Sequence, residues 1–196
     1  MRFRQRLEAG EPVVGALVIG DSIARGDEAP TSAQGFMGLW ADAIHNRYGC
    51  RVVVTNLSMG GATAKTAYRT LRQVIALSDY KLLILSVGVN DAALRVPVRR
   101  YAKTLRRIAK YASKHGTEVL VLTPIQPQNA DAAPYAEAIR NSGLLYADVH
   151  AFSFRIQFAN GINHPDAAGH QLIASVLLDR TTRADAVLVP LLRHAH

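Results

Sequence analysis

A serine and a histidine stand at two breaks in the apolar pattern of this sequence. Ser22 follows an apolar run in the stretch LVIGDSIARG at residues 17–26, and His164 precedes a proline in NHPDAAGH at 163–170. A serine hydroxyl becomes an effective nucleophile only when a base lies within hydrogen-bond reach. The two residues therefore predict acyl transfer, with Ser22 as the nucleophile and His164 as the general base.

Acyl transfer also requires hydrogen-bond donors for the negative charge that develops on the carbonyl oxygen. Two further turns offer such donors, NLSMGGAT at 56–63 and GVND at 88–91. We expect the backbone N–H groups of Ser22 and Gly61 and the side-chain amide of Asn90 to form this oxyanion hole. The two glycines of the first turn also suit a tight connection, because glycine tolerates positive φ.

These residues need a scaffold that brings distant turns together. Apolar, β-branched runs alternate along the chain with stretches of helical spacing. The expected strands cover 13–19, 51–55, 82–87, 118–123 and 144–149, and the expected helices cover 34–48, 62–77, 97–114, 132–141 and a last stretch that starts at Pro165. This alternation predicts a three-layer α/β/α sandwich with a five-stranded parallel sheet. In the flavodoxin-like order 2-1-3-4-5, the turns after the first three strands are neighbours.

Length and composition favour a single unit. The chain has 196 residues, 49% of them hydrophobic, which predicts one domain over 1–196. Residues 1–12 are expected to form a helical lead-in, and 180–196 a tail that docks through apolar side chains. No apolar run is long enough for a membrane span or a convincing signal peptide, so we expect a cytoplasmic protein with no membrane partner.

The net charge of +8 raises the question of nucleic-acid binding, because a basic face attracts phosphates. The densest basic stretch, 95–114, places Tyr101, Leu105, Ile108 and Ala112 at helical spacing. The charges then fall on the opposite side of an amphipathic helix. We expect this side to be a solvated outer face and expect no nucleic-acid partner.

The sequence indicates no cofactor and no metal. His170 lies six residues after His164, which places the two on different helical faces, and the other histidines lack ligand spacing. GGATAKT at 60–66 lacks the glycine that a phosphate-binding loop needs directly before its Lys-Thr pair. We expect His170 to be structural.

Four motifs in this order resemble the SGNH or GDSL hydrolases: GDS at 20–22, NLSMGGAT at 56–63, GVND at 88–91 and NHPDAAGH at 163–170. The resemblance implies hydrolysis of an ester or thioester, with the serine as nucleophile and the histidine as base. It also implies that Gly61, or alternatively Gly60, and Asn90 are the oxyanion donors. The family includes short-chain esterases, lipases, thioesterases and carbohydrate O-deacetylases. The chain has short connections and no obvious lid, so we expect short-chain acyl esters, cleaved through an acyl-enzyme, with O-acetyl sugars as the leading natural substrate.

The last motif departs from the family pattern. It usually reads D-x-x-H, but Gly161 stands three residues before His164. The imidazole could instead be oriented by a backbone carbonyl, by the side-chain oxygen of Asn160, or by a carboxylate such as Asp166 or Asp148. We favour a Ser-His dyad oriented by a backbone carbonyl or Asn160, because Asp166 is also the type of residue expected in a first helical turn.

This departure leaves a second interpretation open, a non-catalytic carbohydrate- or protein-binding module on a degenerate hydrolase fold. In the loop after the fourth expected strand, Gln126, Gln128 and Asn129 could line the leaving-group side of a site, and the alternative is a solvated loop. Asp21 is expected to order the turn before the serine. Asp91 is expected to cap a helix.

Overall fold

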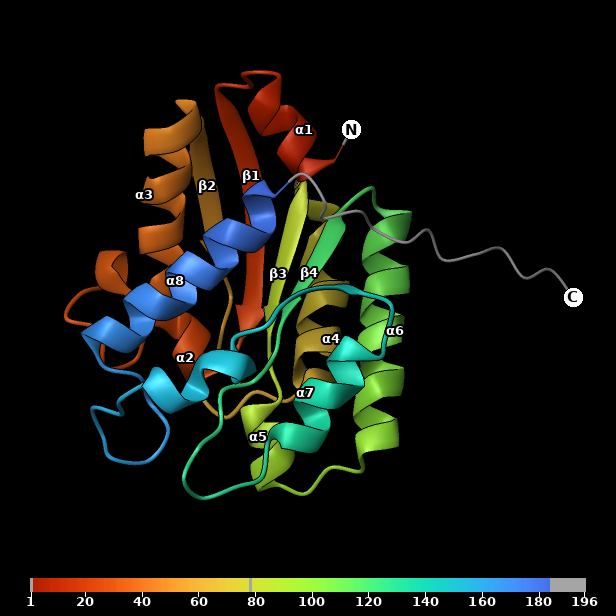
Figure 1. Ribbon diagram of the computed structural model, residues 1–196. Coiled ribbons are helices and arrows are strands. Elements are labelled where there is room, and N and C mark those ends of the chain that lie inside the picture. Colours follow the sequence, from red (N-terminus) through yellow and green to blue (C-terminus); the bar gives the residue numbers. More distant parts are fainter. Residues whose placement is uncertain (1, 78, 184–196) are drawn as a thin grey trace, which may run out of the picture.

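Five parallel strands form the central sheet of the computed structural model, which describes residues 2–77 and 79–183 (Figure 1). The strands are β1 (Val13–Gly20), β2 (Arg51–Asn56), β3 (Leu82–Ser86), β4 (Glu118–Leu122) and β5 (Leu145–Ala147). Their order in the sheet is β2-β1-β3-β4-β5, and all four pairings are parallel. The predicted sheet and its 2-1-3-4-5 order are confirmed.

Helices cover both faces of the sheet (Figure 1). One face carries α1 (Phe3–Glu8), α3 (Phe36–Tyr48) and α8 (Ala167–Thr182), and the other carries α4 (Ala64–Val74), α6 (Val98–Lys114) and α7 (Ala133–Arg140). Two short helices, α2 (Ser22–Arg25) and α5 (Val89–Ala93), follow β1 and β3 directly. Short 3-10 turns lie at Ser32–Gln34, Ile75–Leu77 and His150–Arg155. The predicted three-layer α/β/α sandwich is confirmed.

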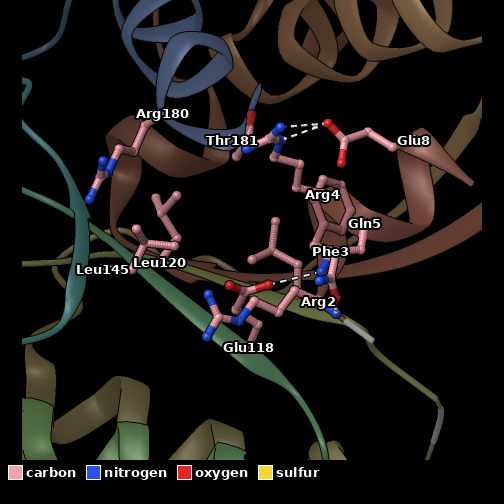
Figure 2. A pocket seen from close by; sticks show the side chains of 11 residues that line it. Arg2, Phe3, Arg4, Gln5, Glu8, Glu118, Leu120, Leu145, Arg180 and Thr181 are labelled. Carbon is pink, nitrogen blue, oxygen red and sulfur yellow. Dashed lines mark hydrogen bonds and ion pairs between the residues drawn. The ribbon is translucent and has the colours of Figure 1, made fainter. Parts of the chain in front are cut away.

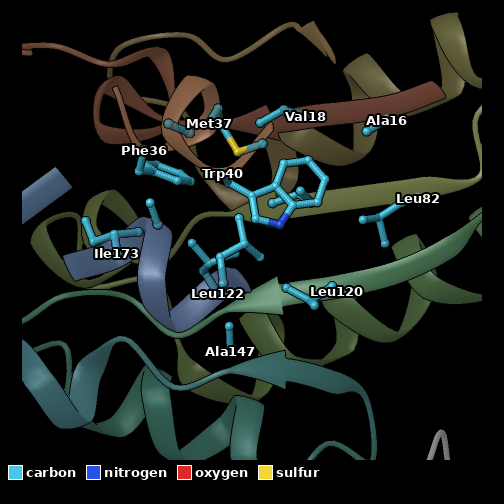
Figure 3. Packing of buried hydrophobic residues seen from close by; sticks show 14 of the residues in the cluster. Ala16, Val18, Phe36, Met37, Trp40, Leu82, Leu120, Leu122, Ala147 and Ile173 are labelled. Atoms are coloured by element: carbon cyan, nitrogen blue, oxygen red, sulfur yellow. The ribbon is translucent and has the colours of Figure 1, made fainter. Parts of the chain in front are cut away.

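Alternate residues of the inner strands β1, β3 and β4 enter different cores, because successive side chains point to opposite faces of a sheet. In β1, Ala16 and Val18 join the core under α3 and α8, whereas Leu17 and Ile19 join the core under α4 and α6. Trp40 is fully buried at the centre of the first core (Figure 3). Its indole N–H donates to Thr181 Oγ1 at 3.1 Å, which ties α3 to α8.

Helix α6 is amphipathic in the predicted way. Its buried residues include all four of the predicted apolar positions between Tyr101 and Ala112. Its seven Arg and Lys side chains are all exposed, so the charge of this helix lies on its outer face. Within the part of the chain that the structure describes, no helix is long and apolar enough to cross a bilayer.

Two boundaries near the end of the chain differ from the prediction. Helix α8 does not start at Pro165, because Asp166 is its N-cap and accepts a hydrogen bond from the Gly169 N–H at 2.8 Å. Pro165 instead forms an isolated antiparallel bridge with Phe158. The helical lead-in is present as α1, and α8 includes the start of the predicted tail at 180–196. The rest of that tail, 184–196, lies outside the described residues.

Candidate active site

Ser22 lies at the carboxyl end of β1, where the strand turns abruptly into α2. The Asp21 side chain caps α2 by accepting from the Ile23 N–H at 3.1 Å. Gly20 has no room for a side chain, because a Cβ there would lie 2.6 Å from the carbonyl oxygen of Ser86. As the first residue of α2, Ser22 has a backbone N–H with no partner inside the helix. Both its hydroxyl and its N–H are therefore presented at this edge of the sheet.

The structure brings His164 to Ser22 across 142 residues of sequence. Nε2 of His164 lies 2.9 Å from Oγ of Ser22, and both side chains are half-buried. His164 is carried by the loop between the 3-10 turn at 150–155 and α8. Backbone hydrogen bonds from Ala159 N–H to the His164 carbonyl and from Asp166 N–H to the Gln157 carbonyl, each 2.9 Å, close this loop. The predicted serine-histidine pair is thus assembled with hydrogen-bonding geometry.

Backbone hydrogen bonds join the turns that carry the predicted oxyanion donors. The Met59 N–H donates to the Gly20 carbonyl at 3.0 Å, which places the 57–63 turn beside the Ser22 turn. The Asn90 side-chain amide donates to the carbonyl of Ala62 at 3.2 Å, which joins the same turn to α5. Gly61 is exposed and has a φ of +75°, a conformation that glycine adopts readily. Ser22, Gly61 and Asn90 therefore lie on three turns at one edge of the sheet.

Two buried carboxyl groups support these turns. Asp21 and Asp91 are 2% and 1% exposed, and Asp91 Oδ2 accepts from the Ala64 N–H at the start of α4 at 2.9 Å. Burial raises the pKa of Asp21 to about 7 and that of Asp91 to about 6. Their side chains point to backbone N–H groups, which agrees with the predicted roles in turn ordering and capping. That Asp91 caps a helix far along the chain, rather than its own, is not visible in the sequence.

Asn160 is the side chain that meets the second ring nitrogen of the histidine. Its Nδ2 lies 3.1 Å from Nδ1 of His164 and 3.0 Å from Oδ1 of Asn163. Its Oδ1 accepts from three backbone N–H groups, each at 3.0 Å: those of Ile162, Asn163 and His164. The prediction that Asn160 lies at the imidazole is therefore met, but by its nitrogen. The side-chain oxygen that we expected there is occupied by the loop backbone.

The two predicted carboxylate substitutes are engaged elsewhere. Asp166 caps α8, as described above, and its Oδ1 bonds to the Gly169 N–H. Asp148 forms a two-pronged ion pair with Arg140, with both N–O distances 3.0 Å, and accepts from the Thr123 hydroxyl. Within residues 2–77 and 79–183, no carboxylate and no backbone carbonyl is hydrogen-bonded to the His164 ring. Neither aspartate acts as the orienting group in this arrangement.

The three predicted binding residues of the loop after β4 lie in different surroundings. The Gln126 side chain donates to the carbonyls of Pro127 and Ala130 and accepts from the Ala132 N–H, so it organises its own loop instead of facing a substrate. Gln128 and Asn129 are exposed. The Gln128 N–H donates to the Ile162 carbonyl at 3.0 Å, which places this loop against the loop of the histidine.

His170 is structural, as predicted. It is fully buried, accepts from the Phe36 N–H at 3.3 Å and bonds to the Asp27 carbonyl at 3.2 Å. Burial lowers the pKa of its imidazole. Among the described residues, no three His, Cys, Asp or Glu side chains are grouped as a metal site would require.

Two of the hollows among the described residues lie on different sides of the molecule. A groove of about 400 Å³ starts at Ala24 and Arg25 of α2 and runs between β2 and α3. A cavity of about 290 Å³ lies at the amino ends of β3, β4 and β5, the sheet edge opposite Ser22 (Figure 2). Within the lining of this cavity, Arg4 pairs with Glu8 at 2.6 Å and Glu118 accepts from the Phe3 N–H at 2.9 Å. Of these two hollows, the groove is the one that adjoins the serine turn.

Comparison with known proteins points to one family. Residues 18–172 match the GDSL-like lipase/acylhydrolase family. A lipolytic protein of the G-D-S-L family from Veillonella parvula has a similar structure, with 21% identity, a TM-score of 0.73 and coverage of 87% of this chain and 99% of that one. A mutant of Axe2, an acetyl-xylooligosaccharide esterase from Geobacillus, gives 18% identity and a TM-score of 0.72, covering 87% and 94% of the two chains.

A two-domain esterase active on acetylated mannans is also similar, with 21% identity and a TM-score of 0.73. The match covers 91% of this chain and 52% of that larger one. At these identities the similarity concerns the fold. No curated protein matches the sequence.

Proposed function

This chain belongs to the GDSL-like lipase/acylhydrolase family, and from that premise we propose that it is a serine esterase that cleaves short acyl esters through an acyl-enzyme intermediate. The observation that carries the proposal is the 2.9 Å contact between Ser22 Oγ and His164 Nε2. A nucleophile and base at this distance can transfer a proton directly.

In the proposed reaction, Ser22 Oγ attacks the ester carbonyl carbon while its proton passes to His164. The carbonyl oxygen becomes negatively charged and is held by the N–H groups of Ser22 and Gly61 and by the Asn90 amide. The tetrahedral intermediate then expels the alcohol, which takes its proton from His164. Water attacks the acyl-serine in the same way, with His164 as the base, and releases the acid.

Several features support a short acyl group on a polar alcohol. Ser22 and His164 are half-buried, so both are within reach of a small ester from solvent. Met59 and Ile162 are 46% and 45% exposed on the turns that carry Gly61 and His164, which offers apolar contact for a few carbons. We infer that the alcohol extends toward the groove beside α2. Two structural neighbours named above act on acetylated carbohydrates, which makes an O-acetyl sugar the leading substrate class.

The test is hydrolysis of p-nitrophenyl esters of increasing acyl length by the wild type and by Ser22→Ala. We expect turnover to be highest for acetate and butyrate, to fall for longer chains, and to disappear in Ser22→Ala and His164→Ala. A fluorophosphonate probe should label the wild type and leave folded Ser22→Ala unlabelled. Preference for long chains would refute the acyl-length proposal, and turnover that persists without Ser22 would refute the mechanism.

A non-catalytic binding module is the second candidate, because the amide of Asn160 stands where an acid would support the histidine. In that case the folded wild type would resist the probe and hydrolyse no ester, yet would retain affinity for an acetylated oligosaccharide. Calorimetric titration with such an oligosaccharide separates the two functions.

A further inference from the structure

The hydrogen bonds of Asn160 fix which end of its amide faces the histidine. Oδ1 accepts three backbone N–H bonds from residues 162, 163 and 164, each 3.0 Å long. Exchanging the oxygen and nitrogen would aim an NH₂ group at three N–H donors and leave all four groups without an acceptor. The loop backbone therefore directs the Asn160 Nδ2 donor at Nδ1 of His164, 3.1 Å away.

A neutral imidazole carries one N–H group and one lone pair, and the partner of one nitrogen decides the state of the other. An amide donor at Nδ1 requires the lone pair there. The proton of neutral His164 is then on Nε2, directed at Ser22 Oγ. A general base needs the opposite arrangement, with the lone pair facing the serine hydroxyl.

We propose that Asn160 is a positioning residue that holds His164 in the Nε2–H tautomer and thereby limits how readily it accepts the proton of Ser22. The inference rests on the proposed function of the site. Turnover then requires the imidazole proton to move from Nε2 to Nδ1, with loss of the bond from Asn160. In the serine-protease triad, an asparagine in place of the aspartate favours the wrong tautomer in the same way and lowers kcat by about 10⁴.

The same loop is built to accept a carboxylate at this position. Asn160→Asp replaces NH₂ by an oxygen of nearly the same size. One carboxylate oxygen would keep the three backbone N–H bonds, which stabilise negative charge, and the other would accept the Nδ1 proton of His164. Asn163 Oδ1 now accepts from Asn160, so its amide would have to rotate and donate instead. Its side chain has no other hydrogen bond among the described residues, so this rotation breaks nothing else.

The first test compares steady-state hydrolysis of p-nitrophenyl acetate by the wild type, Asn160→Asp and Asn163→Asp at about pH 8, above the ordinary imidazole pKa of about 6.5. Asn160→Asp should raise kcat by about 10²–10⁴-fold with little change in KM. Asn163→Asp adds the same charge within the same loop. Its carboxylate oxygen would keep accepting from the Asn160 amide, as the Asn163 oxygen does now, without bonding to the ring, so kcat should rise by less than about fivefold. Ser22→Ala added to Asn160→Asp should abolish the gain.

The second test reads the tautomer directly, by ¹⁵N NMR of histidine-labelled protein, with Ser22→Ala and His164→Gln spectra to assign the His164 signals. The wild type should show the proton on Nε2, and Asn160→Asp should show it on Nδ1. A wild type with the proton on Nδ1, or a folded Asn160→Asp whose kcat does not exceed that of Asn163→Asp, would overturn the inference. If neither protein shows Ser22-dependent turnover, the proposed function fails, and the spectrum alone still decides the tautomer.

Discussion

Replacing Asp21 with asparagine should make the stability of the protein less dependent on pH. Burial raises the pKa of Asp21 from 3.8 to about 7 in the folded protein. Between these pH values the unfolded chain ionises while the folded protein keeps its proton, so stability is full below the lower value and is lost as pH rises through about 7. At 1.36 kcal/mol per pK unit, a difference of about three units costs about 4 kcal/mol at alkaline pH.

Asparagine cannot ionise, and its side-chain oxygen can keep the hydrogen bond to the Ile23 N–H. Asp21→Asn should therefore match the wild type at about pH 4 and exceed it by up to about 4 kcal/mol at about pH 8. Urea unfolding followed by the fluorescence of the buried Trp40 measures both values. Asp42→Asn, on the exposed side of α3, is the matched control and should change stability by less than about 0.5 kcal/mol at either pH.

The reasoning fails if Asp21→Asn changes stability equally at both pH values. Asp21 would then be ionised in the folded protein despite its burial, and its hydrogen bonds would outweigh the loss of solvation.

Asn90→Ala should lower kcat for p-nitrophenyl acetate by about 10²–10³-fold with little change in KM, because one oxyanion donor is lost. If KM changes more than kcat, Asn90 binds the substrate instead. Gly20→Ala should lower the free energy of unfolding in urea by about 1–3 kcal/mol, because the new Cβ would lie 2.6 Å from the carbonyl oxygen of Ser86. An unchanged urea midpoint would show that the turn can open. Trp40→Phe should lower the free energy of unfolding by about 1–3 kcal/mol, because the hydrogen bond to Thr181 is lost and a cavity is left behind. Unfolding followed by circular dichroism measures this change, and a stability equal to that of the wild type would contradict the prediction.

The sheet could be predicted because its signals extend over whole elements. Continuous apolar strands alternate with amphipathic helices, and no single residue decides that pattern. The start of α8, in contrast, depends on which of two neighbouring residues, Pro165 or Asp166, sets the first turn of the helix. Pro165 suits a first helical position, but the Asp166 side chain accepts from the Gly169 N–H. This capping bond makes Ala167 the first helical residue, two residues later than proline alone suggests.

The meeting of the serine and histidine follows from topology, because the carboxyl ends of parallel strands share one edge of the sheet. Contacts of loop side chains do not follow in this way. The Gln126 side chain could bind a polar ligand, but its amide forms hydrogen bonds to the backbone of its own loop. Whether a polar side chain faces solvent or its own backbone depends on loop geometry, which periodicity does not encode.

The site combines parts that are held in two different ways. Two backbone hydrogen bonds fix the serine turn to the sheet: the Asp21 N–H donates to the Ser86 carbonyl, and the Met59 N–H donates to the Gly20 carbonyl. The strands therefore set the backbone position of any residue in this turn. The histidine loop is held mainly by its own backbone and by the Asn160 oxygen. Because that oxygen and a carboxylate oxygen would accept the same three N–H groups, residue 160 can change the proton position on His164 without changing the loop. A sequence motif that records only the serine and histidine therefore predicts where the proposed reaction would occur. In our proposal, the atom that faces Nδ1 sets how readily that reaction would proceed.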